Sequence, residues 1–247
     1  MAHFNTHIKF VDSLNSNLDK KYLLSGSVFP DIGLYVNFSE KTKERDFTHF
    51  LHFPEPRSEN GIKFGKALME KAKTKEELSF AVGVYSHFFL DQTVHAYIMK
   101  NNLPMAKHIM LEFFRAHNDF SKRVKKLYLP KEFCASVFEE TFPLDKDYAL
   151  QIREVGWLKL FRFRFINDYL LRYLIKTNYG EKQKKLRLIR FIFSFFQLKY
   201  KRTRRVNLYS YLYPPWILKK VHLSNLDRII VKTKTDFIKN LAVNWNL

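Results

Sequence analysis

The feature that most limits how this chain can fold is residues 74–100, which carry the pattern of one long helix. Thr74 and Glu77 form a capping box at its start, and no proline follows before residue 104. Within this stretch His87, Asp91 and His95 are spaced by four residues. Because a helix turns every 3.6 residues, these side chains lie along one stripe that drifts only about 40° per step. One helix can therefore offer three metal ligands on one face.

The residues beside this stripe are apolar, so the His and Asp side chains should be buried and should need compensating partners. A divalent cation would supply that compensation. His108 and Glu112 repeat the four-residue spacing in a second apolar stretch. A single histidine is more often a hydrogen-bonded core residue, but five ligand-type residues at this spacing indicate a metal site. Nitrogen and carboxylate oxygen together suit zinc.

The rest of the chain also predicts helices, since apolar residues recur at steps of three and four and glycine-rich turns are scarce. We predict an all-α, single-domain multi-helix bundle that encloses the metal site, because no linker interrupts the 247 residues. Residues 1–128 would form the metal-binding core, and 129–247 a basic, aromatic-rich helical part. The expected helices are 4–18, 61–72, 74–100, 104–128, 146–178, 182–200 and 216 onward. Two connections, 25–33 and 41–60, would hold further polar residues, namely Asp31, His49 and His52.

Positive charge is concentrated in residues 151–210, which contain sixteen Lys or Arg against three acidic residues, within a net charge of +19. Such a block attracts phosphate groups. Aromatic residues alternate with the cations in 157–165 and 185–196, a composition that suits an interfacial helix on anionic lipid. It equally suits single-stranded nucleic acid, whose bases stack on aromatic rings. It also suits helices that bury their aromatics and leave Lys and Arg solvated.

The single cysteine, Cys134, excludes an internal disulfide, and we expect a buried, inert thiol. The first residues lack the basic start and apolar run of a signal peptide. The most apolar short run, 191–196, is far below the roughly 20 residues that a membrane span needs. We expect a cytoplasmic protein without a transmembrane segment, for which peripheral contact with an anionic membrane stays open.

Several motifs resemble one known family. Residues 87–98 are similar to the His-Tyr-x-x-Asp-x-x-x-His-Pro-Tyr-Ile core of the zinc-dependent phospholipase C superfamily, also called the phospholipase C/D domain. Thr6-His7 and Pro30-Asp31-Ile32 look like its amino-terminal Thr-His and Gly-Pro-Asp-Ile motifs, and residues 108–112 like its downstream His-x-x-x-Glu. The order also matches, so the resemblance covers roughly residues 1 to 120. The fungal single-strand nucleases, which are distantly related, use a similar cluster.

The resemblance implies two or three zinc ions and a specific ligand set. One ion would be bound by four residues: Asp31, His49, His87 and Asp91. A second would take three: His95, His108 and Glu112. A third would share the bridging Asp91 with His7 and amino-terminal groups. Two substitutions within this set stay open: His52 in place of His49, and His3 in place of the amino terminus.

The function that the resemblance implies is zinc-dependent hydrolysis of a phosphodiester, of the phospholipase C type, by metal-activated water. The substrate would be a phospholipid or a related phosphodiester. Asp31 is the candidate general base or water-orienting residue, and Asp91 the bridge that sets the metal spacing. Two alternatives remain: a nuclease or nucleotide phosphodiesterase, and a non-catalytic protein that keeps zinc for stability while it binds membrane or nucleic acid.

Overall fold

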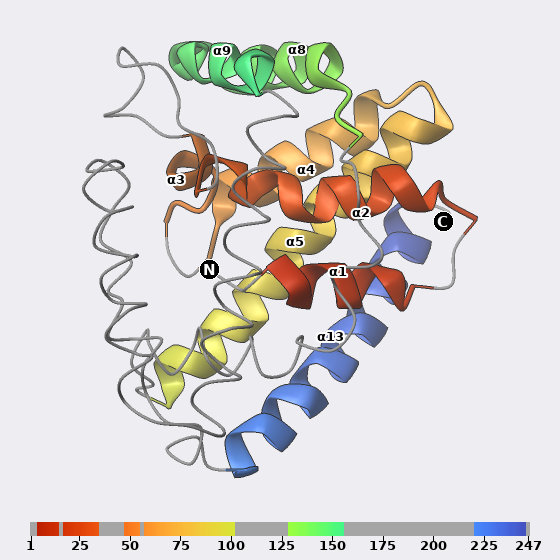
Figure 1. Ribbon diagram of the computed structural model, residues 1–247, viewed down its shortest axis with the longest axis vertical. Helices are drawn as coiled ribbons and strands as arrows, with labels where there is room; N and C mark the ends of the chain where they lie inside the picture. Colours follow the sequence, from red (N-terminus) through yellow and green to blue (C-terminus); the bar gives the residue numbers. More distant parts are fainter. Residues whose placement is uncertain are drawn as a thin grey trace, which may run out of the picture.

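The computed structural model describes residues 4–14, 17–34, 47–54, 57–101, 128–155 and 220–245 (Figure 1). All regular structure in these residues is helical, which confirms the predicted all-α class. The α-helices are α1 (Phe4–Asp12), α2 (Lys20–Val28), α3 (Phe47–Leu51), α4 (Glu59–Lys71), α5 (Lys75–Lys100), α8 (Lys131–Thr141), α9 (Asp147–Glu154) and α13 (Lys220–Trp245). Two 3-10 helices, η1 (Phe29–Leu34) and η3 (Pro143–Asp145), connect some of them.

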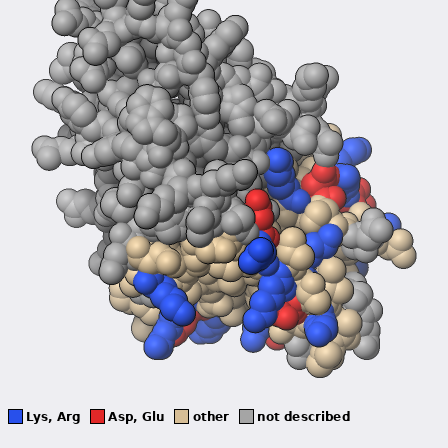
Figure 2. Space-filling view, turned by 90° about the horizontal axis from the view of Figure 1, so that it is seen from below, with Lys and Arg blue, Asp and Glu red and all other residues tan. Residues whose placement is uncertain are grey.

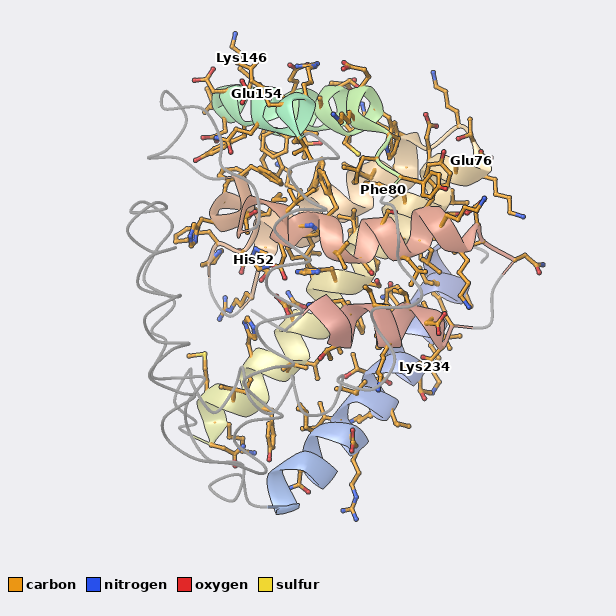
Figure 3. The ribbon with its side chains drawn as sticks, viewed as in Figure 1. His52, Glu76, Phe80, Lys146, Glu154 and Lys234 are labelled. Atoms are coloured by element: carbon orange, nitrogen blue, oxygen red, sulfur yellow. The ribbon has the colours of Figure 1, made fainter. Side chains whose placement is uncertain are left out.

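Helix α5 crosses the middle of the fold, and α2, α4 and α13 pack around it (Figure 1). Its predicted capping box is present: the Thr74 hydroxyl accepts the Glu77 amide at 3.1 Å, and the Glu77 carboxylate accepts the Thr74 amide at 3.2 Å. Phe80 on α5 is fully buried, whereas Glu76 one turn earlier points outward (Figure 3). The predicted long helix is therefore confirmed, and it forms the centre of the core.

The backbones of α2 and α5 touch where Gly26 faces Gly83. A Cβ atom built on Gly83 would lie 2.3 Å from the Leu23 carbonyl oxygen, and one built on Gly26 would lie 2.1 Å from the Phe80 carbonyl oxygen. Neither distance is possible for a real side chain, so only glycine permits this approach. The contact holds α2 directly beside the stripe that carries the candidate ligands.

This crossing corrects the interpretation of residues 25–33 as an irregular loop. Gly26 indicated a turn from sequence, but it lies inside α2, and residues 29–34 form η1. The first helix ends at Asp12 rather than at 18, and α2 begins after Asp19, whose carboxylate accepts the Lys21 amide at 2.8 Å.

The predicted connection 41–60 contains the short helix α3, and α4 begins at Glu59, two residues before the expected start. Helices α8 and α9 pack on each other, and α8 packs on α4 (Figure 1). Helix α9 begins at Asp147, one residue after the expected start, and ends at Glu154, so the helix predicted over 146–178 does not run on through Val155. The predicted helix 104–128, apart from Tyr128, lies outside the described residues, as do the predicted helix 182–200 and residues 156–178.

Helix α13, near the carboxyl end of the chain, packs along α5 and contacts α1. The Phe237 ring is fully buried and contacts the rings of Phe10, Tyr85 and Phe89, with centroids 5.3–5.8 Å apart. The Tyr85 hydroxyl donates to Asn240 Oδ1 at 3.1 Å. In the described part of the chain, no helix has the length and apolar character that crossing a membrane requires.

Candidate metal centre

Six His and Asp side chains from four parts of the fold meet beside the middle of α5. Helix α1, η1 and the residue after α3 each supply one, and α5 supplies three along its predicted stripe. All are buried, with at most 7% of the residue surface exposed. They are His7, Asp31, His52, His87, Asp91 and His95.

Two of the histidines are oriented by backbone carbonyls. His87 Nδ1 lies 2.8 Å from the Ser27 carbonyl oxygen, and His52 Nδ1 lies 2.6 Å from that of Thr48. Because a carbonyl only accepts, both Nδ1 atoms carry a proton, and the neutral form of each ring therefore has its lone pair at Nε2. These two Nε2 atoms are 3.2 Å apart. Two facing lone pairs repel, so the arrangement favours a cation between them. A histidine that binds a metal usually donates its other ring N–H to a carbonyl or carboxylate, as both rings do here.

Carboxylate oxygens complete a four-atom group around this point. Asp31 Oδ1 lies 3.5 Å from His52 Nε2 and 3.8 Å from His87 Nε2. Asp91 Oδ2 lies 3.3 Å and 3.6 Å from the same two nitrogens. Ligands about 2.0–2.2 Å from a tetrahedral zinc are separated by about 3.3–3.6 Å. The residues present therefore fit zinc in both chemistry and spacing.

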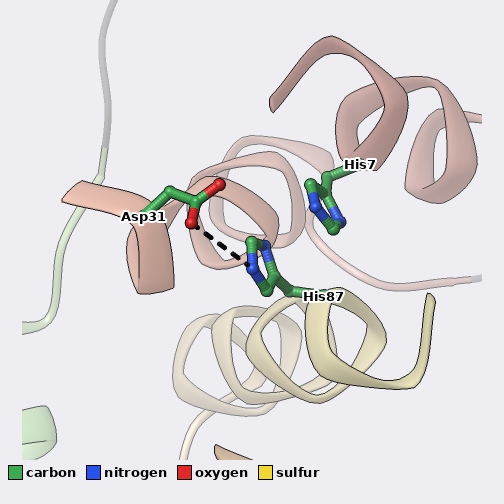
Figure 4. Close-up of side chains that lie close together, drawn as sticks. All are labelled: His7, Asp31 and His87. Atoms are coloured by element: carbon green, nitrogen blue, oxygen red, sulfur yellow. Dashed lines mark ion pairs between the residues drawn. The ribbon is translucent and has the colours of Figure 1, made fainter. Parts of the chain in front are cut away.

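The second oxygen of Asp91 faces other histidines. Asp91 Oδ1 lies 3.3 Å from His7 Nε2 and 3.8 Å from His95 Nε2. The His7 ring also stacks on the His87 ring, with centroids 3.7 Å apart, and ligand atoms of His7, His87 and Asp31 lie within 4.8 Å of one another (Figure 4). With one oxygen directed to each side, Asp91 has the placement of a carboxylate that bridges two cations.

Several polar atoms at this centre lack the partners that buried groups require. Both carboxylate oxygens of Asp31 and Nδ1 of His7 have no hydrogen-bond partner within the described ranges. An unsatisfied buried polar group costs free energy, and native proteins seldom leave one without a reason. A bound metal ion provides the reason, because it would take up carboxylate and imidazole lone pairs.

Burial and neighbouring charges set the protonation of the cluster. Burial raises the pKa of Asp31 to about 6. Burial also lowers the pKa of His87 well below its ordinary value. For Asp91 burial alone would raise the pKa, but the charge of His95 and the close contacts with His52 and His7 lower it well below the usual range. A neutral His87 and a charged Asp91 are the forms that bind metal.

Five of the sequence-predicted ligands are thus brought together: His7, Asp31, His87, Asp91 and His95. From the segment around α3 it is His52 that joins them. His49 is half-buried and belongs to neither of the two sets of close ligand atoms, which are His7, Asp31 and His87, and His52, His87 and Asp91. His108, Glu112 and His3 lie outside the described residues. The orienting carbonyls of Ser27 and Thr48 were not predicted, since every residue has a carbonyl and sequence does not distinguish these two.

Comparison with known proteins agrees with this geometry. The family model described as zinc dependent phospholipase C matches residues 4–151, which contain all six clustered side chains. The search of curated proteins and the search of solved structures gave no match. The match extends past the roughly 120 residues that carry the sequence motifs, and it covers more than half of the 247-residue chain. The protein therefore belongs to the zinc-dependent phospholipase C family, a family of hydrolases.

Proposed function

We propose that this protein hydrolyses a phosphodiester with zinc held by the buried His and Asp cluster. The observation that carries the proposal is the pair of facing Nε2 atoms of His52 and His87, 3.2 Å apart, with a carboxylate oxygen of Asp31 and of Asp91 beside both. The five distances among these four atoms range from 3.2 to 3.8 Å, close to the edges of about 3.3–3.6 Å expected for a zinc tetrahedron. His7 and His95 face the other oxygen of Asp91 and would serve a second ion.

Zinc bound here would supply Lewis acidity, which lowers the pKa of water toward 7 and stabilises charge on phosphoryl oxygens. The chain itself supplies orientation and proton handling. Ser27 and Thr48 fix the rings of His87 and His52 through their carbonyls. Asp31 directs Oδ1 toward these histidines, and Oδ2 can accept a proton from an attacking water. A carboxylate oxygen within reach of the attacking water is suited to the role of general base.

The first experiment compares zinc content and hydrolysis of a chromogenic phosphodiester between the wild-type protein and Asp91→Asn. The substitution keeps the shape of the side chain but removes the charge that faces four histidines. We expect zinc content and turnover to fall together. Asp236→Asn, at an exposed position on α13, is the matched control and should retain both. A wild-type protein that binds no zinc would refute the proposal.

The proposed substrate class is phospholipid, in keeping with the family to which the chain belongs. The competing class is nucleic acid, which rests on the sixteen Lys and Arg residues of 151–210, most of which lie outside the described ranges. On the face shown in Figure 2, the described Lys and Arg side chains are interspersed with acidic ones. This mixed face gives no particular support to binding of a polyanion.

A substrate panel separates the classes. Release of phosphorylated headgroups from phospholipid vesicles, abolished by a chelator, would support the phospholipase function. Cleavage of single-stranded nucleic acid that weakens steeply with salt would support a nuclease instead. Bound zinc without turnover of either substrate, together with unfolding when a chelator removes the zinc, would favour a non-catalytic protein that keeps zinc for stability.

A further inference from the structure

The short helix α3 delivers His52 to the metal centre, and a distant side chain holds its first residue. The backbone amide of Phe47, where α3 begins, donates to Oε1 of Gln151 at 3.1 Å. Gln151 is 1% exposed and lies on α9, 104 residues away along the chain. A helix of five residues has few internal hydrogen bonds, so its conformation depends on such outside partners.

The hydrogen bond between Phe47 and Gln151 lies one helical turn before the candidate ligand His52. Thr48, next to Phe47, is fully buried, and its carbonyl accepts both the backbone amide of His52 at 3.1 Å and His52 Nδ1 at 2.6 Å. The position of that carbonyl therefore sets the direction of the His52 ring. Displacement of the first turn of α3 would turn Nε2 away from His87 and Asp91.

The packing around α3 ties it to the same outer helices. The Phe50 ring contacts Phe142 and Tyr148 with centroids 4.9 and 5.0 Å away, and Asn60 Nδ2 donates to the Phe50 carbonyl at 3.0 Å. These contacts hold α3 against α4, α8 and α9 after its first residues. At its first residue, a directional contact is the hydrogen bond from Phe47 to Gln151, and residue 151 is also where the family match ends.

We infer that Gln151 is a positioning residue for the metal centre, which acts by holding the first amide of α3 so that the Thr48 carbonyl orients His52. This inference rests on the proposed zinc site. It assigns a function to the α8–α9 pair, which supplies no ligand among the described residues.

The test measures release of zinc from the full-length protein to a chromogenic chelator, at a temperature where every variant is folded. Methionine in Gln151→Met has a similar volume to glutamine but offers the Phe47 amide no oxygen acceptor. We expect this variant to release zinc about 10-fold faster than wild type, the low end of the range for loss of a group that orients a metal ligand. Gln151→Glu keeps an oxygen acceptor and should restore slow release. Ile152→Val, at the adjacent and fully buried position, loses packing without this hydrogen bond and is the control.

The visible spectrum of the cobalt-substituted protein provides a second readout, because it reports ligand geometry and not stability. We expect it to change in Gln151→Met and to stay the same in Ile152→Val. If the Met variant does not fold, Gln151→Asn, whose shorter side chain cannot reach Phe47, replaces it.

Three results would overturn the inference. Equal zinc release in Gln151→Met and wild type would do so while leaving the proposed function intact. Equally fast release in Gln151→Met and Ile152→Val would reduce Gln151 to a packing residue. A wild-type protein without zinc would overturn the inference and the proposed function together.

Discussion

Replacing Gly83 with alanine probes the contact between α2 and α5 and, through it, the metal centre. The new Cβ would lie 2.3 Å from the Leu23 carbonyl oxygen, against about 3.4 Å for an ordinary contact, so α2 must move by about 1 Å. Ser27, also on α2, accepts the hydrogen bond from His87 Nδ1 at 2.8 Å. A shift of this size away from α5 would break that bond, since donor and acceptor would be beyond hydrogen-bond range.

The magnitude follows from three contributions. Overpacking in a close-packed core costs about 1–3 kcal/mol, and loss of the His87 hydrogen bond costs about 1 kcal/mol. Alanine is a better helix former than glycine by about 1 kcal/mol, which offsets part of this. We therefore expect the free energy of unfolding to fall by about 1–3 kcal/mol. Zinc affinity should fall by about 10-fold or more, because an orienting partner of a ligand is lost.

Urea unfolding of the zinc-free protein measures the first effect, and competition with a chelator measures the second. Gly65→Ala is the control: its Cβ would lie 2.9 Å from Tyr85 Cα, a milder conflict between α4 and α5 that involves none of the candidate ligands. It should lose less stability and keep its zinc affinity. A Gly83→Ala protein as stable as wild type, with unchanged zinc affinity, would show that the close crossing is not what positions His87.

Three further predictions address other parts of the fold. His52→Ala should lower the zinc content of the purified protein, whereas His49→Ala should leave it unchanged. Elemental analysis measures the zinc content, and the reverse result would assign the ligand to His49. Phe237→Ala should reduce the free energy of unfolding, measured in urea titrations, by about 3–5 kcal/mol, because it removes a fully buried ring. A loss below about 1 kcal/mol would show that the packing of α13 contributes little to stability. Cys134 should resist thiol reagents at neutral pH, since burial raises the pKa of its thiol well above the ordinary value. Its labelling rate should follow the rate of unfolding, and rapid labelling of the folded protein would contradict this prediction.

The parts of the centre that could be predicted from sequence are those set by local periodicity. His87, Asp91 and His95 share one stripe because four residues make slightly more than one turn, and the capping box fixed where that helix begins. Both depend on steps of at most four residues along the chain. The all-α class followed from the same periodicity over most of the chain.

The parts that could not be predicted depend on contacts between distant segments. Gly26 indicated a loop because glycine marks turns, whereas its function here is to admit the backbone of α5. His49 and His52 are equally good ligands by residue type, and only the fold shows which of them faces His87. Gln151 carries no signal, because its partner is a backbone amide 104 residues earlier.

The packing of α13 has a practical consequence for anyone who wishes to produce the protein. Family similarity ends at residue 151, so an expression fragment designed on that boundary would omit residues 220–245. Such a fragment would leave the surfaces of Phe10, Tyr85 and Phe89 that Phe237 covers open to water, and exposed aromatic clusters promote aggregation. Insolubility of the shortened chain would then be a consequence of the cut and would say nothing about its chemistry.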